Sequence, residues 1–185
     1  MEYSYKFFTG LGLLIGIAMQ PLSAQPISCA DDETATHVSG KIYNSAVQPG
    51  VTLGTVHLHL GAHKGEKHRM KCGILGQGAT SPDGSANFIH TFVCDDQVIH
   101  PVSGESYHSQ LTLNTSGFAN FQACPAGYPP GSAYGTFEET SVPLPGTGRG
   151  IFENVERGEI HIKGTLNCLF AIDMKFKGEV CLKNS

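Results

Sequence analysis

Apolar and polar residues alternate along most of this chain, and the spacing typical of helices is nearly absent. In Val56-His57-Leu58-His59-Leu60 the apolar residues occupy every second position, and Phe170 to Lys177 repeats the pattern. Successive side chains of a β-strand point to opposite faces, so such segments form strands with one apolar face. The chain also contains 23 glycines and 10 prolines, which interrupt the alternating segments. The sequence therefore predicts an all-β protein.

The alternating segments number about eight. Residues 114–117 (Asn-Thr-Ser-Gly) predict a hairpin turn, and residues 71–87 are expected to form the longest loop. Antiparallel strands with one apolar face must close on themselves or pack as two sheets, and closure removes exposed edges. We therefore expect a single antiparallel β-barrel of about eight strands. The predicted strands are 38–43, 56–60, 88–94, 107–113, 118–123, 134–142, 159–163 and 170–177.

The first residues have the features of an export signal. Lys6 precedes an apolar run from Leu11 to Met19, Pro21 ends the run, and Ala24 is a small residue suited to cleavage. Removal of residues 1–24 would leave residues 25–185 as one domain in a secreted or periplasmic protein. No later run is apolar enough for a membrane-spanning helix. Lipid anchoring at Cys29 is an alternative, although the residues before it match a lipobox poorly.

All six cysteines lie beyond the predicted signal. An even number in an exported chain favours disulfides, and six cysteines allow 15 pairings. Cys72 and Cys94 flank one segment and Cys168 and Cys181 flank another, so either pair could join the ends of its segment. The absence of CxxC spacing disfavours a structural zinc site and a redox dithiol.

The formal net charge of the chain is −4, and its isoelectric point is near 6.1. The basic residues between Lys64 and Lys71 are diluted by Glu66 and by histidines. Nucleic-acid binding requires a sustained basic surface, so nucleic acid is not expected as a partner. A homo-oligomer is one of the assemblies that this chain could form.

Glycines punctuate a corner between two predicted strands, from Thr136 to Gly164. Gly146, Gly148 and Gly150 allow the positive φ and sharp bending that other residues resist. We expect Phe152 and Val155, which follow this corner, to close one end of the barrel.

Several spaced pieces in residues 107–180 resemble the allene oxide cyclase family of small β-barrels, which is related to dirigent-type barrels. The resemblance rests on Thr136-Phe137-Glu138-Glu139-Thr140, the glycines of 146–150, Ile151-Phe152-Glu153-Asn154-Val155, Gly158 and Lys177-Gly178. It implies a barrel that holds a fatty-acid-derived epoxide in an apolar cavity, where a glutamate and a bound water steer the chemistry.

By this resemblance, Cys94 corresponds to a cysteine that lines the family's cavity, and Asn44 corresponds to a polar residue there. His90 lies on the same strand face as Cys94, and Phe88 and Phe92 would line the ligand cavity. The family's glutamate has no counterpart, because residues 41–43 (Lys-Ile-Tyr) occupy its stretch. Cys94 could instead be half of a disulfide, and His90 a hydrogen-bonded core histidine.

A second candidate constellation is a group of histidines. His57 and His59 share one strand face, and His63 and His68 follow nearby, a spacing that suits Cu or Zn. Glu66 could add an oxygen ligand. Histidine is also a common polar residue on the exposed face of a strand, so the metal site is one of two interpretations.

Three functional hypotheses follow from these residues. The first is an exported barrel that binds a small apolar molecule and, if catalytic, acts as an isomerase or cyclase by confinement and positioning. The second is a secreted structural or interaction barrel without catalysis, and the third is a metal-binding secreted protein. Glu138 and Glu139 are neighbours on a predicted strand and should point to opposite faces, so they cannot form an acid and base pair.

Overall fold

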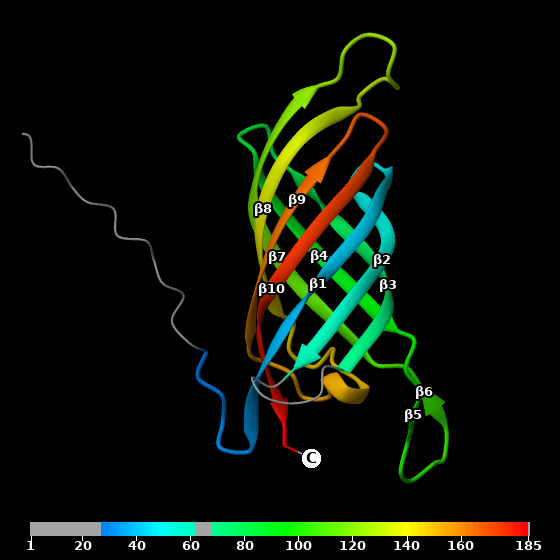
Figure 1. Cartoon of the computed structure of the whole chain (residues 1–185), viewed down its shortest axis with the longest axis vertical. Helices are drawn as coiled ribbons and strands as arrows, with labels where there is room; N and C mark the ends of the chain where they lie inside the picture. Colours follow the sequence, from blue (N-terminus) through cyan, green and yellow to red (C-terminus); the bar gives the residue numbers. More distant parts are fainter. Residues whose placement is uncertain (1–26, 62–67, 185) are drawn as a thin grey trace, which may run out of the picture.

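The computed structural model describes residues 27–61 and 68–184, and these form one closed antiparallel β-barrel (Figure 1). The eight strands follow the order β1-β10-β9-β8-β7-β4-β3-β2 around the barrel. The prediction of an all-β, eight-stranded antiparallel barrel is therefore confirmed. The barrel strands are β1 (Glu33–Gln48), β2 (Val51–Gly61), β3 (His68–Thr80), β4 (Ser85–Cys94), β7 (Gln110–Ala123), β8 (Ala133–Pro143), β9 (Gly158–Leu166) and β10 (Ala171–Lys183).

Two of the predicted segments were wrong, and the errors cancel in the strand count. The expected hairpin turn at residues 114–117 lies inside β7, which is one continuous strand paired with β4 and β8. The expected loop at residues 71–87 contains most of β3, which pairs with β2 and β4. One strand was divided into two and another was missed, so the predicted number remained eight.

The lower end of the barrel in Figure 1 is closed by the 3-10 helix η1 (Gly150–Phe152) and the residues after it. Phe152 and Val155 are almost fully buried, and the Phe152 ring packs edge-to-face on Phe92 with centroids 5.4 Å apart. The Ile151 N–H donates to Ser109 Oγ at 3.0 Å, which anchors the corner to the residue just before β7. Gly150 has a φ of +67°, as the corner requires. The prediction that Phe152 and Val155 close one end is confirmed.

Near this end lies the small hairpin of β5 (Val98–Ile99) and β6 (Ser106–Tyr107), which projects outside the barrel wall (Figure 1). Asp96, just before the hairpin, accepts hydrogen bonds from the backbone N–H and the hydroxyl of Ser109. Since the Ser109 hydroxyl also accepts a hydrogen bond from the Ile151 N–H, one buried hydroxyl joins the hairpin base, the start of β7 and the corner.

All six cysteines form disulfides: Cys29–Cys181, Cys72–Cys94 and Cys124–Cys168. The suggested pair Cys72–Cys94 is confirmed, and it joins residues directly opposite on β3 and β4. The suggested pair Cys168–Cys181 was wrong, because both of its members bond elsewhere.

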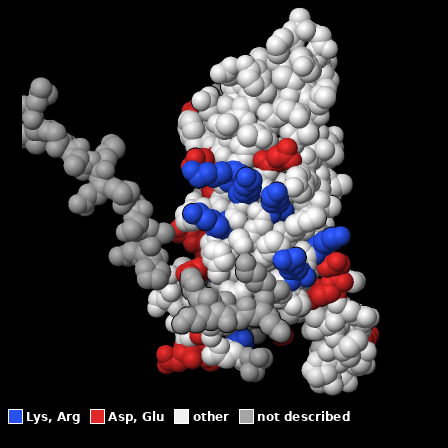
Figure 2. Space-filling model, in the orientation of Figure 1, with Lys and Arg blue, Asp and Glu red and all other residues white. Residues whose placement is uncertain are grey.

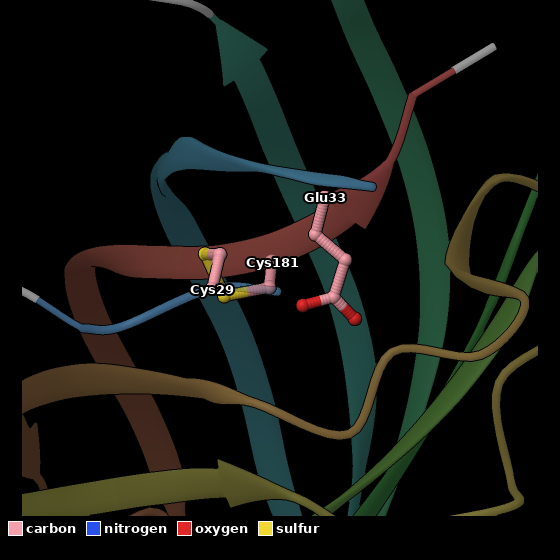
Figure 3. A group of neighbouring side chains, drawn as sticks. All are labelled: Cys29, Glu33 and Cys181. Carbon is pink, nitrogen blue, oxygen red and sulfur yellow. A yellow bond between two sulfur atoms is a disulfide. The ribbon is translucent and has the colours of Figure 1, made fainter. Parts of the chain in front are cut away.

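The Cys29–Cys181 bond joins the segment before β1 to the end of β10, and Figure 3 shows Glu33 beside it. The two sulfurs are bonded to each other, so they are not thiolates available to a metal. The Glu33 carboxylate instead accepts the Ala30 N–H at 2.9 Å and pairs with Arg157 at 3.5 Å. This group of side chains fastens the chain entering the barrel.

The predicted signal, residues 1–24, lies outside the described residues. In the segments that the structure does describe, we find no helix with the length and apolar character needed to span a membrane.

Candidate functional site

The barrel is hollow at the end opposite the η1 plug. A cavity of about 160 Å³, partly open to solvent, lies where the turns β1–β2, β3–β4 and β9–β10 meet the end of β7. Most of its walls are apolar, with Ala46, Phe88, Phe137 and Met174 among them. Below it, the interior retains a space of only about 30 Å³ between core side chains such as Ile42, Leu58 and Phe176. The barrel therefore combines a packed core with one open apolar pocket.

Three buried polar side chains enter this apolar cavity from three different strands. They are Asn44 on β1, His90 on β4 and Glu139 on β8, with relative exposures of 5%, 6% and 8%. Strand alternation explains why Glu139 and not Glu138 enters the cavity. Glu138 faces solvent and Glu139 faces inward, as predicted for neighbouring residues of β8. Buried ionisable groups in a pocket are a mark of functional sites.

His90 is held by a chain of buried hydroxyl groups. Its Nδ1 lies 3.0 Å from Thr115 Oγ1, which lies 2.6 Å from Ser141 Oγ. The imidazole also stacks on Phe88, with centroids 5.7 Å apart and planes at 13°. Burial lowers the pKa of His90 from 6.5 to about 4, because the charged imidazolium loses its hydration. The imidazole is therefore neutral at physiological pH.

Glu139 is the residue that the sequence interpretation missed. Burial raises the pKa of its carboxyl from 4.5 to about 7, because the carboxylate would be poorly solvated in the apolar cavity. The carboxyl has no hydrogen-bond partner among the described residues. It is thus close to half protonated at neutral pH and is free to contact a ligand. The alternation Phe137, Glu139, Ser141 was the sequence signal that could have placed it inside.

Asn44 contributes an unsatisfied acceptor. Its Nδ2 donates to Thr52 Oγ1 at 3.3 Å, whereas its buried Oδ1 has no partner among the described residues. Buried polar atoms are nearly always hydrogen-bonded, so an orphan at a cavity wall is unusual.

Glycines on the neighbouring strands make room for all three polar side chains. Each polar residue lies directly opposite a glycine in the sheet, and a Cβ built on that glycine would fall within 3 Å of the polar side chain. The cross-strand pairs are Asn44 with Gly54, His90 with Gly76 and Glu139 with Gly117. Glycine inside a strand often marks such close approach. In all three cases a glycine on the neighbouring strand therefore accommodates the polar side chain.

Replacing Gly76 by alanine should disrupt the site. The new Cβ would lie 2.5 Å from Thr52 Oγ1 and 2.7 Å from His90 Cδ2, so the imidazole or β3 must move. We expect a loss of roughly 1–3 kcal/mol in the free energy of unfolding, measured by urea denaturation. Gly73→Ala on the same strand is the control, because its Cβ would meet nothing within 4 Å. Equal effects at the two positions would contradict this steric account.

The other residues singled out in the sequence lie as follows. Phe88 lines the cavity, whereas Phe92 lies deeper, against Phe152. Cys94 is bonded to Cys72, so the structure has a disulfide half there rather than a free thiol.

The histidine cluster lies on the outer wall. His57 and His59 project outward from β2, and His68 is exposed at the start of β3. His63 lies outside the described residues. In residues 27–61 and 68–184, the only three potential metal ligands that converge are Cys29, Glu33 and Cys181. The four-histidine metal site therefore stays a prediction.

No family model matches the chain, and comparisons with curated proteins and with solved structures find no match. Chemical interpretation of the cavity therefore depends on the residues of this chain.

Proposed function

We propose that this chain is an exported barrel that binds a small, mainly apolar molecule carrying one uncharged polar group. The observation that carries the proposal is an apolar cavity that contains Glu139 and His90, both buried and both without charge near pH 5.5. Three disulfides support export, since such bonds persist in oxidising compartments.

The cavity volume limits the size of the ligand. A cavity of about 150 Å³ can hold a benzene ring, and this cavity has about 160 Å³. One ring, or the end of a longer chain that extends into solvent, fits that volume. A protonated Glu139 can donate a hydrogen bond to the polar group, and Asn44 Oδ1 can accept one.

Binding of p-cresol at pH 5.5, measured by titration calorimetry, tests this proposal. We expect p-cresol to bind roughly 3- to 10-fold more tightly than toluene, because one hydrogen bond contributes about 0.5–1.5 kcal/mol. The anion p-toluate should bind more weakly than p-cresol, because its charge would be buried in an apolar site. Absence of p-cresol binding, or equal binding of all three probes, would reject the proposal.

Two neighbouring positions on β1 provide a matched pair of variants. Ala46 lines the cavity and Ser45 points outward, so Ala46→Leu should weaken p-cresol binding by at least about 10-fold while Ser45→Leu leaves it unchanged. Loss of binding in both variants would place the probe outside the cavity.

A second candidate function is isomerisation or cyclisation of the bound molecule. It is favoured by the pKa of Glu139 near 7, which suits a group that both donates and accepts protons at physiological pH. The likeness to allene oxide cyclases makes a fatty-acid epoxide the first substrate to assay. Glu139→Gln should abolish its turnover while p-cresol binding at pH 5.5 persists. Retained turnover would exclude Glu139 as the proton carrier.

A further inference from the structure

Six basic residues lie together on the outer wall of the barrel, away from the cavity. They are carried by β9, β10, β1 and β3, and Figure 2 shows basic residues gathered at mid-height, below an upper region with few charges. They represent six of the nine Lys and Arg residues among the described residues, so most of this positive charge lies on one wall, beside several acidic residues, although the whole chain has a net charge of −4. We call this surface the basic belt: Lys41, Arg69, Lys71, Lys163, Lys175 and Lys177.

The sheet register places the core of the basic belt in one row across five strands. Lys163 on β9 lies opposite Lys175 on β10, which lies opposite Lys41 on β1. The row continues through His57 on β2 to Lys71 on β3. Lys177 and Arg69 lie two residues along their strands from Lys175 and Lys71. The row spans roughly 19 Å at the usual spacing between strands.

This row is unfavourable in the protein alone. Side chains directly opposite in an antiparallel sheet lie about 5 Å apart, and like charges there destabilise the pair. Lys175 has a lysine on both sides, and within the described residues the only belt member in an ion pair is Lys163, bonded to Glu138 at 2.7 Å. The neighbouring acid Asp173 is offset to the next row, opposite Tyr43. A bound polyanion would remove the repulsion.

The shape of the row selects the kind of polyanion. The row crosses four of the eight intervals between strands, which is half of the barrel circumference, so a flat membrane surface cannot contact both ends of the row. A flexible linear polymer can follow it. Single-stranded nucleic acids also require aromatic platforms for their bases, and Tyr43 is the only tyrosine or phenylalanine of the described residues beside the row.

We propose that the basic belt binds a linear anionic polysaccharide. Such a chain would lie across the strands, with one anionic group near each of Lys175, Lys41 and Lys71. Binding at this outer surface is independent of the proposed cavity ligand.

The test is binding of heparin to the full-length protein in 50 mM salt. Lys41→Gln/Lys175→Gln should weaken binding roughly 10- to 30-fold, because each lysine near an anionic surface contributes about 1 kcal/mol. Because these changes remove like-charge pairs, stability should remain equal or increase. The slope of log Kd against log salt should fall by about 2, since two fewer counterions are released.

The control removes two charges outside the belt, in Arg149→Gln/Lys183→Gln, and should change heparin binding less than 2-fold. No heparin binding by the unaltered protein, or equal losses in the two double variants, would overturn the proposal. Single-stranded DNA or phosphatidylserine vesicles binding as tightly as heparin would also overturn it, in favour of a nucleic acid or a membrane.

Discussion

Glu139→Gln should make the protein more stable above pH 7 by about 3 kcal/mol. The folded state raises the pKa of this carboxyl from 4.5 to about 7, so the folded state disfavours the charged form. The contribution of the carboxyl to stability is fully present below pH 4.5 and is lost as the pH rises through 7. Each pKa unit corresponds to 1.36 kcal/mol, which yields about 3 kcal/mol for this shift.

The measurement is the free energy of unfolding of both proteins from pH 4 to pH 8, obtained by guanidinium denaturation. The free energy of unfolding of the variant minus that of the unaltered protein should be nearly constant near pH 4 and should increase between pH 4.5 and 7. A difference that does not change with pH would show that Glu139 does not titrate inside an apolar cavity.

His90 shows the opposite dependence of stability on pH, so His90→Asn is the counterpart of Glu139→Gln. The pKa of His90 falls from 6.5 to about 4 on folding, so its contribution is present above pH 6.5 and is lost as the pH falls through 4. Between pH 4.5 and 6.5 the two slopes oppose each other in the unaltered protein. The folded site is then uncharged, which is the condition for the binding proposed above.

Much of the barrel follows from alternation alone, and the exceptions share a physical cause. β3 looked like a loop because Gly73, Gly76 and Gly78 lower its strand propensity. In the structure Gly76 and Gly78 lie opposite His90 and Phe88, where only a glycine leaves room for the rings. The residues that conceal the strand are therefore those that create the site.

The candidate site was only partly predictable for a related reason. Asn44 was identified from the family resemblance and His90 from its strand face, shared with Cys94, and both line the cavity. Glu139 was set aside as one of two adjacent glutamates, although alternation from Phe137 already places it inward. Its altered pKa depends on the apolar walls supplied by other strands, which no local pattern contains. The Asn-Thr-Ser-Gly stretch similarly looked like a turn because its inward Thr115 is polar, yet that hydroxyl supports His90.

Removing the Cys29–Cys181 disulfide should cause a large loss of stability, about 5 kcal/mol. This bond links residues 152 positions apart, at the two ends of the chain that meet when β1 pairs with β10. In the chain-entropy description, a disulfide stabilises by restricting the unfolded chain, and the effect grows with the length of the closed loop. The bond therefore stabilises the β1–β10 pairing, which closes the barrel and joins the two barrel strands most distant in sequence.

The matched variant lacks Cys124–Cys168, which closes a loop of 44 residues and should contribute about 4 kcal/mol. Guanidinium unfolding of Cys29→Ala/Cys181→Ala and Cys124→Ala/Cys168→Ala measures both losses, and the first should be larger.

The effect of the two variants on ligand dissociation should follow the opposite order. Cys124 follows β7, whose Phe121 lines the cavity, and Cys168 follows Leu166 of β9, which lines it as well. Loosening this bond should therefore speed p-cresol dissociation, whereas the chain-end bond should leave it unchanged. An equal effect of the two variants on dissociation would mean that the Cys124–Cys168 bond has no special part in shaping the cavity mouth.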